Sequence, residues 1–299
     1  MLTPLLAAAL AFLQAGPQPQ MVVRTPPKPQ TAGSDSCIRM ELARVIPVIP
    51  ITIGGRELKV GLDTGAPGGP HLPLTLIEAL GAEQVGEARM SDPSLQNPVP
   101  VGLYRIDDLQ VGNIEVDNWI ATGRADPRPS ALGVDGIIGL DAFDGFVVTI
   151  DYPSSRLVLT RGRLPEPDGR TSFRYEGPIP RVPLTLDGQT ITAHIDTGNA
   201  RYALIAPTTA ADALPGRSDA FAVGLARTVN NTFTLMAVPV DEARVGTLDL
   251  HAGTVAFPSP GPHGNLGSLL LRDMVVKIDP ANQIVALERS AGAEDGCLT

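Results

Sequence analysis

Two stretches of this chain resemble each other at a constant offset, and this internal repeat constrains the fold more than any other feature. Residues 50–63 and 183–196 pair position by position at an offset of 133, without a gap. A second pair of segments, 139–151 and 267–279, follows in the same order at an offset of 128. Matching signals in the same order indicate a duplicated domain of roughly 120 residues, which lies within the usual domain size. We therefore expect two halves related by a pseudo-twofold axis.

The residue pattern within each half is typical of short β-strands. Apolar residues alternate in runs bounded by turn residues, aromatic residues make up 4% of the chain, and glycine and proline are abundant. Hairpins are predicted around four turn segments, at 54–55, 187–188, 152–155 and 280–282. Helix is predicted only in short pieces, at 73–80 and 207–213. The expected fold class is all-β, or mostly β.

The first 36 residues are not expected to belong to either half. Residues 1–15 hold an apolar run that is too short to span a bilayer and is followed by small residues, as in a signal peptide. An N-terminal anchor or a mis-assigned start is the alternative. Residues 16–36 are rich in Pro, Gln and Ser, and they predict a flexible tether. The seam at 161–173, rich in Gly and Pro, then divides the chain into lobes at 37–167 and 168–299.

The net charge and the two cysteines bear on which partners the protein binds and on where it functions. A formal net charge of −9 argues against binding to nucleic acid, whose phosphates would repel an acidic surface. No apolar run after the N-terminal segment reaches membrane-spanning length. The two cysteines, Cys37 and Cys297, bracket the folded region. In an exported protein they could form a disulfide that closes a long loop, worth about 5 kcal/mol at most; two free thiols are the alternative.

The repeated tripeptide Asp-Thr-Gly carries the chemistry that the sequence predicts. It ends a predicted strand in each half, at 63–65 and at 196–198. The glycine lets backbone N–H groups approach the carboxylate closely, and the threonine hydroxyl can lock the loop. If the two loops meet, both carboxylates cannot ionise and one proton is shared. The ionised carboxylate then takes a proton from a water that attacks an amide carbonyl, while the protonated carboxyl donates to the carbonyl oxygen.

With these loops the chain resembles the pepsin and retropepsin type of aspartic peptidase, in the bacterial branch that carries both lobes in one polypeptide. The resemblance also covers a later hydrophobic-hydrophobic-Gly element in each half, at 137–139 and 265–267. It implies two acid-protease-like β-barrel lobes with an active-site cleft between them. By resemblance, Asp63 and Asp196 are the catalytic pair. The residues expected to support the active-site loops are Thr64, Gly65, Thr197, Gly198, Ile138, Gly139, Leu266 and Gly267.

A few positions depart from the family pattern or have an open role. Ala66 and Asn199 stand where many members have a Ser or Thr that bonds the outer carboxylate oxygen, and Asn265 replaces an apolar residue. Tyr104, in a strand-like stretch, is the candidate flap residue, and an ordinary strand aromatic is the alternative. His194 is predicted to be a partly exposed strand histidine, with contact to the site as the alternative.

Other site chemistries find no support in the sequence. The four histidines show no metal-ligand spacing, no Gly-x-Ser-x-Gly occurs, and the glycine-rich run 65–70 lacks the Lys-Ser/Thr ending of a phosphate loop. The sequence predicts an exported monomeric aspartic endopeptidase, periplasmic or secreted, that needs no metal or organic cofactor. Its expected partner is a polypeptide substrate bound in extended conformation. A catalytically inactive module that holds a peptide or cell-wall fragment in the same cleft is the alternative.

Overall fold

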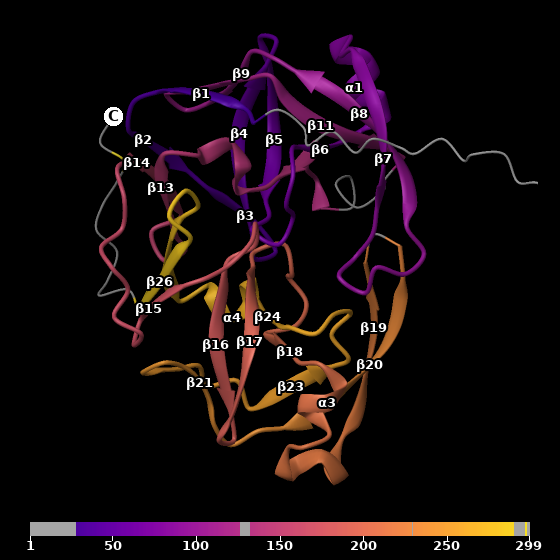
Figure 1. The fold of residues 1–299 in the computed structure, drawn as a ribbon, viewed down its shortest axis with the longest axis vertical. Helices are drawn as coiled ribbons and strands as arrows, with labels where there is room; N and C mark the ends of the chain where they lie inside the picture. The colour runs from indigo at the N-terminus through magenta and orange to yellow at the C-terminus, as the bar shows by residue number, and fades with distance from the viewer. Residues whose placement is uncertain (1–27, 126–131, 229, 290–296, 298–299) are drawn as a thin grey trace, which may run out of the picture.

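The structure is a computed structural model that describes residues 28–125, 132–228, 230–289 and 297. Most of these residues lie in β-strands and few in helices, which confirms the all-β prediction (Figure 1). The strands form three sheets. The predicted signal peptide, 1–15, and the first part of the predicted tether lie outside the described residues.

The first sheet belongs to the N-terminal half. In spatial order its strands are β1 (Gln30–Gly33), β10 (Ile114–Asp117), β9 (Leu109–Val111), β4 (Ile46–Ile53), β5 (Arg56–Leu62), β12 (Gly136–Ile138), β6 (His71–Pro73), β11 (Trp119–Arg124), β8 (Val99–Ile106) and β7 (Gln84–Met90), and β3 (Glu41–Ala43) pairs with β4. Strands β4 and β5 form the predicted hairpin. Strand β12 runs parallel to β5 and places Ile138 opposite Leu62, so it supports the strand end that precedes the first Asp-Thr-Gly.

The second sheet belongs to the C-terminal half and repeats this arrangement. In spatial order its strands are β22 (Leu248–Asp249), β21 (Ala243–Val245), β16 (Arg181–Leu186), β17 (Gln189–Asp196), β24 (Gly264–Gly267), β18 (Leu204–Ile205), β23 (Thr254–Phe257), β20 (Thr232–Pro239) and β19 (Phe221–Arg227). Each of these nine strands has a counterpart at the same place in the order from β10 to β7. Strand β24 runs parallel to β17, as β12 does to β5. The internal repeat of the sequence therefore corresponds to a repeated strand order.

The third sheet joins the two halves. Its order is β15 (Ser172–Arg174), β26 (Ile284–Arg289), β25 (Met274–Asp279), β13 (Phe146–Asp151), β14 (Arg156–Arg161) and β2 (Ser36–Arg39). The two predicted closing hairpins, β13–β14 and β25–β26, pair antiparallel through β13 and β25. Cys37 in β2 forms a disulfide with Cys297, with the two Cα atoms 5.3 Å apart. The predicted disulfide is therefore present, and the free-thiol alternative is wrong.

The helices are short. They are α1 (Leu74–Leu80), α3 (Thr208–Ala211) and α4 (Ser268–Leu271), with 3₁₀ turns η1 (Leu140–Phe143) and η2 (Pro215–Asp219). The helix predicted at 73–80 is confirmed, whereas the one predicted at 207–213 is shorter. None of the helices among the described residues is long and apolar enough to cross a membrane.

The tether prediction is wrong for its last residues. Residues 30–33 form strand β1, which pairs with β10 at the edge of the first sheet. Thr31 also donates a hydrogen bond to the carbonyl of Ala142, 3.1 Å away. The polar composition of this segment suggested a loop. However, β10 would otherwise be an edge strand with unpaired backbone N–H and C=O groups, and the backbone of a polar segment can pair with them.

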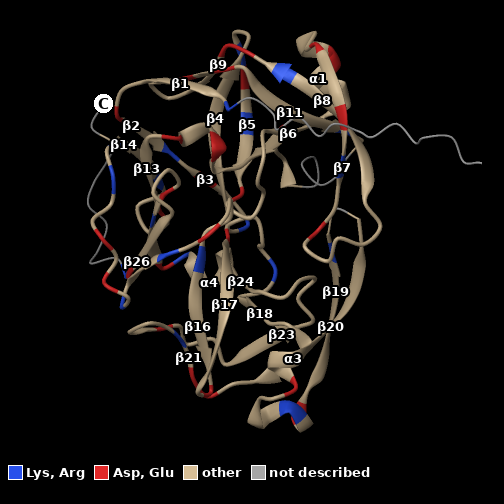
Figure 2. Ribbon diagram, viewed as in Figure 1, with Lys and Arg blue, Asp and Glu red and all other residues tan. Residues whose placement is uncertain are grey.

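A continuous apolar core underlies both halves and reaches the ends of the strands that carry the Asp-Thr-Gly motifs. Leu62, Ile138, Ile195 and Leu266 are fully buried in it. Lys and Arg are scattered over both halves and do not gather in a single band (Figure 2). The motifs therefore follow strands whose last residues are apolar and buried.

Candidate active site

The two Asp-Thr-Gly loops begin at matched places in the two halves. Asp63 directly follows β5, and its N–H donates to the carbonyl of Ile138 at 2.9 Å. Asp196 ends β17 and pairs with Gly267 of β24. A Cβ on Gly139 would lie 2.1 Å from the carbonyl oxygen of Ala66, so only glycine lets β12 pass this close to the loop. The predicted supporting elements thus lie behind the loops.

Thr64 and Thr197 join the two loops reciprocally. The Thr64 hydroxyl donates to the carbonyl of Ile195 and the Thr197 hydroxyl to the carbonyl of Leu62, both at 2.6 Å. Each hydroxyl also accepts the backbone N–H of the other threonine, at 3.0 and 3.1 Å. Both side chains are buried, so these bonds are shielded from water. The loops are fixed to each other by a matched set of hydrogen bonds.

This cross-link brings the two aspartates together. A Cβ on Gly198 would lie 2.3 Å from Oδ2 of Asp63, and a Cβ on Gly65 would lie 2.8 Å from Oδ1 of Asp196. Each glycine therefore makes room for the carboxylate of the opposite loop. The side chain of Asp63 is also a hydrogen-bond partner of Asp196. Figure 1 shows the β4–β5 and β16–β17 hairpins approaching each other from opposite ends of the molecule.

Several donors surround the carboxylate of Asp196. Its Oδ1 accepts the backbone N–H groups of Gly198 and Asn199 at 3.0 and 3.1 Å, and its Oδ2 accepts the side-chain amide of Asn265. Burial raises the pKa of Asp196, and the hydrogen bonds from Asn265 and Asp63 offset part of this effect. On the other loop, Oδ1 of Asp63 accepts the N–H of Gly65 at 2.9 Å. A raised pKa in a close carboxyl pair is what sharing one proton requires.

The two asparagines that depart from the family pattern are partners. Nδ2 of Asn199 donates to Oδ1 of Asn265 at 2.8 Å, which leaves the amide nitrogen of Asn265 directed at Asp196. Sequence reasoning treated the two positions as unrelated departures and so missed this Asn199–Asn265–Asp196 relay. Two amides at unusual places behind the same loop are the signal that could have revealed it.

A second polar cluster joins the tips of two hairpins, β7–β8 and β19–β20. Oδ2 of Asp92 accepts the hydroxyl of Thr228 at 2.6 Å and the amide of Asn231 at 3.0 Å, and its backbone N–H donates to Oδ1 of Asn230 at 3.0 Å. Burial opposes ionisation of Asp92, but the hydrogen bonds from Ser94, Thr228 and Asn231 outweigh it, so its pKa is lowered. We call Asp92, Thr228, Asn230 and Asn231 the tip clasp. The two hairpins lie on the same flank of the molecule (Figure 1).

The structure places Tyr104 at the base of the β7–β8 hairpin. Its ring packs over Gly102 and Gly123, where an added Cβ would lie 2.5 Å from the ring in either case. The ring also packs against the apolar core. The tip residues that meet the other hairpin lie farther along, so the role of Tyr104 as a flap residue stays a prediction.

His194 is not the partly exposed residue that the sequence predicted. It is 8% exposed, because β17 is an interior strand of its sheet, and its ring centroid lies 5.2 Å from that of His263. Burial, together with the nearby charges of Arg181 and His263, lowers the pKa of His194 to about 4. The imidazole is therefore neutral near neutral pH.

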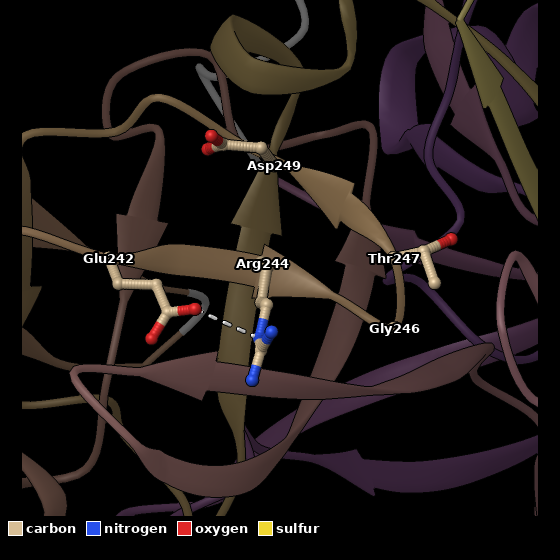
Figure 3. Close-up of a pocket in the computed structure, with 5 residues that line it drawn as sticks. All are labelled: Glu242, Arg244, Gly246, Thr247 and Asp249. Carbon is tan, nitrogen blue, oxygen red and sulfur yellow. Dashed lines mark ion pairs between the residues drawn. The ribbon is translucent and has the colours of Figure 1, made fainter.

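A surface hollow lies away from both motifs. It encloses about 370 Å³ and is lined by Glu242, Arg244, Gly246, Thr247 and Asp249 (Figure 3). Nε of Arg244 pairs with Glu242 at 3.1 Å, so its charge is already matched. None of the site residues predicted from the sequence lines this hollow.

Comparison with known proteins agrees with the motif in the N-terminal half. Residues 49–142 match a family model described as aspartyl protease, and the matched region includes the first Asp-Thr-Gly and the element at 137–139. No curated protein matches the chain. The match supports an aspartyl protease family for this chain.

Proposed function

We propose that this protein is an aspartic endopeptidase that hydrolyses peptide bonds with a water molecule activated between Asp63 and Asp196. The observation that carries the proposal is the reciprocal packing of the loops, in which the glycine of each motif lies against the carboxylate of the other. The family match at residues 49–142 supports the same reaction class.

The proposed reaction needs only the two carboxyl groups and one shared proton. The ionised carboxylate removes a proton from the water, whose oxygen forms a bond to the amide carbon. The protonated carboxyl donates its proton to the carbonyl oxygen, which gives a tetrahedral diol. When the diol collapses, the C–N bond breaks and the protonated carboxyl gives its proton to the departing nitrogen. The other carboxylate takes a proton from one diol hydroxyl as the C=O bond re-forms, so the pair again holds one proton. Both carboxyl groups are partly buried, and the lower dielectric there strengthens these electrostatic effects.

The proposal also includes the division of the chain into two lobes and its location outside the cytoplasm. Residues 37–167 and 168–299 form the two lobes of a single-chain, pepsin-like enzyme, which acts as a monomer on an extended polypeptide. The matching strand order of the two large sheets supports two equivalent lobes. The Cys37–Cys297 disulfide is compatible with export to the periplasm or secretion.

Peptide cleavage by the purified chain between pH 3 and 7 tests the proposal. Asp63→Asn and Asp196→Asn are each expected to lower kcat/KM by at least about 10²-fold, because each removes one member of the acid–base pair. Asp241→Asn, which changes an exposed aspartate, is the matched control and is expected to keep full activity. Unchanged cleavage in either dyad variant would overturn the mechanism.

The alternative is an inactive module that binds a peptide or cell-wall fragment in the same place. Both Asp-Thr-Gly loops are intact, which favours the enzyme. Binding of a pepstatin-like inhibitor without turnover of any peptide would instead support the binding module.

A further inference from the structure

The loop that follows Asp196 carries an exposed cation, Arg201. Oδ1 of Asn199 accepts the backbone N–H groups of Arg201 and Tyr202, both at 3.2 Å, and its Nδ2 donates to the carbonyl of Tyr202 at 3.0 Å. The loop is therefore held in one shape by the same asparagine that orients the relay to Asp196. Arg201 is exposed, and its guanidinium carbon lies 5.6 Å from the centroid of the Tyr202 ring.

The guanidinium of Arg201 and the hydroxyl of Tyr202 both lie close to Gly224. An ideal Cβ on Gly224 would lie 3.1 Å from Nη2 of Arg201 and 3.7 Å from Oη of Tyr202. Gly224 has a φ of +128° and lies at a β-bulge between β19 and β20, a conformation that favours glycine. The absence of a side chain here leaves space for both polar groups.

Both groups line one cavity. The cavity encloses about 170 Å³ between the loop after Asp196 and the β19–β20 hairpin; its other lining residues are Ala203, Leu204, Val223, Ala237, Thr254 and Ala256. Oη of Tyr202 is buried without a hydrogen-bond partner among the described residues. Arg201 takes part in none of the ion pairs among the described residues. A buried hydroxyl without a partner is costly, and a ligand acceptor would satisfy it.

A carboxylate fits this pair of donors, and it is the anionic group that a peptide substrate supplies. A guanidinium binds carboxylate oxygens in a planar fork, and a phenol O–H can donate to a second oxygen. At the repeat offset, the positions equivalent to Arg201 and Tyr202 in the first half are Gly68 and Gly69, which offer neither donor. We propose that Arg201 and Tyr202 form a subsite for an acidic side chain, Asp or Glu, on one side of the scissile bond. This proposal rests on the proposed peptidase function.

A library of C-terminally amidated peptides that vary Asp, Glu, Asn, Gln and Lys at each position tests the subsite. The full-length protein is expected to cleave peptides with Asp or Glu at one position about 10- to 100-fold faster in kcat/KM than their amide counterparts, the range of a charge-assisted hydrogen bond. Arg201→Gln should abolish the preference, Arg201→Glu should shift it towards Lys, and Tyr202→Phe should weaken it. Arg244→Gln, an arginine outside the subsite, should keep it.

Several outcomes separate the subsite from the peptidase function. Cleavage with equal rates for acidic and amide side chains would overturn the subsite and leave the peptidase intact. A preference that survives Arg201→Gln, or one that occurs only with a free C-terminal carboxylate, would also overturn it. If no peptide is cleaved, calorimetry still tests the subsite: acidic peptides should bind the wild type more tightly than the Arg201→Gln variant, and equal binding would refute the subsite.

Discussion

The two Asp-Thr-Gly loops are alike in their backbone connections and different in the side chains behind them. Thr64 and Thr197 exchange equivalent hydrogen bonds, so the cross-link is symmetric. Behind Asp196, the side chain of Asn265 donates to Oδ2 of the carboxylate, whereas the equivalent residue of the first half is Ile137, whose side chain has no donor. The comparison indicates that the duplicated fold fixes where the carboxylates lie, and that unmatched side chains set their electrostatics.

The largest expected effect is a loss of stability that tests the symmetric threonine cross-link. Thr64→Val or Thr197→Val removes one hydroxyl and leaves a carbonyl and an N–H unpaired in a buried site. At about 1–3 kcal/mol for each unsatisfied group, either variant should lower the free energy of unfolding by about 2–6 kcal/mol, and by a similar amount in both halves. Urea unfolding measures this.

The serine variants at the same positions are the matched controls for this test. Thr64→Ser and Thr197→Ser keep the hydroxyl and lose only a methyl group, so their loss should stay near 1 kcal/mol. A large loss in one half and a negligible loss in the other would contradict a symmetric cross-link.

The next largest effect is a shift in the pH profile that tests the asymmetric hydrogen bond from Asn265 to Asp196. Asn265→Ile copies the first half and removes a donor that favours the ionised carboxylate of Asp196. Because loss of such a donor raises the carboxyl pKa, the acid limb of the kcat/KM profile should move to higher pH. A charge-assisted hydrogen bond of about 1.5–3 kcal/mol corresponds to a shift of about 1–2 pH units.

Ile137→Val is the matched change on the other side and should leave the acid limb in place, since no donor is lost. A carboxyl NMR titration of both variants reports the same pKa without relying on turnover. An unmoved limb in Asn265→Ile, with the titration of the pair also unchanged, would show that the relay is structural only.

The repeat made much of the fold predictable. Hairpins around Gly54-Gly55 and Asp187-Gly188 follow from alternation and turn chemistry, which are local properties. The cross-link between the halves was accessible only through resemblance, because a threonine hydroxyl that bonds a carbonyl in the other half leaves no local trace in the sequence.

What escaped prediction depends on contacts between distant segments. Asn199 and Asn265 look like two isolated departures until the parallel pairing of β17 and β24 brings them together. His194 was predicted to be partly exposed because periodicity does not show which strands lie inside a sheet. The strand at 30–33 was missed because its pairing with β10 satisfies the backbone, which a polar composition does not reveal.

The smallest expected effect tests where the two halves meet at their hairpin tips. The tip clasp is also unequal, since the first half supplies the acceptor Asp92 and the second the donors Thr228 and Asn231. Asp92→Asn should leave at least one donor unpaired and weaken the clasp by about 1 kcal/mol, so that amide exchange in both hairpins speeds up roughly fivefold. Hydrogen-exchange mass spectrometry measures this, with Asp241→Asn as the control.

The pH dependence of this exchange gives the sharper test of the clasp. Because the pKa of Asp92 is lowered below 3.8 in the folded state, its contribution is complete above the unfolded value and is lost as the pH falls through the folded one. The wild type and Asp92→Asn should therefore differ at pH 6 and converge in strong acid. Equal exchange at pH 6 would mean that the tips meet without help from Asp92. The inequality between the halves would then be confined to the surroundings of Asp196.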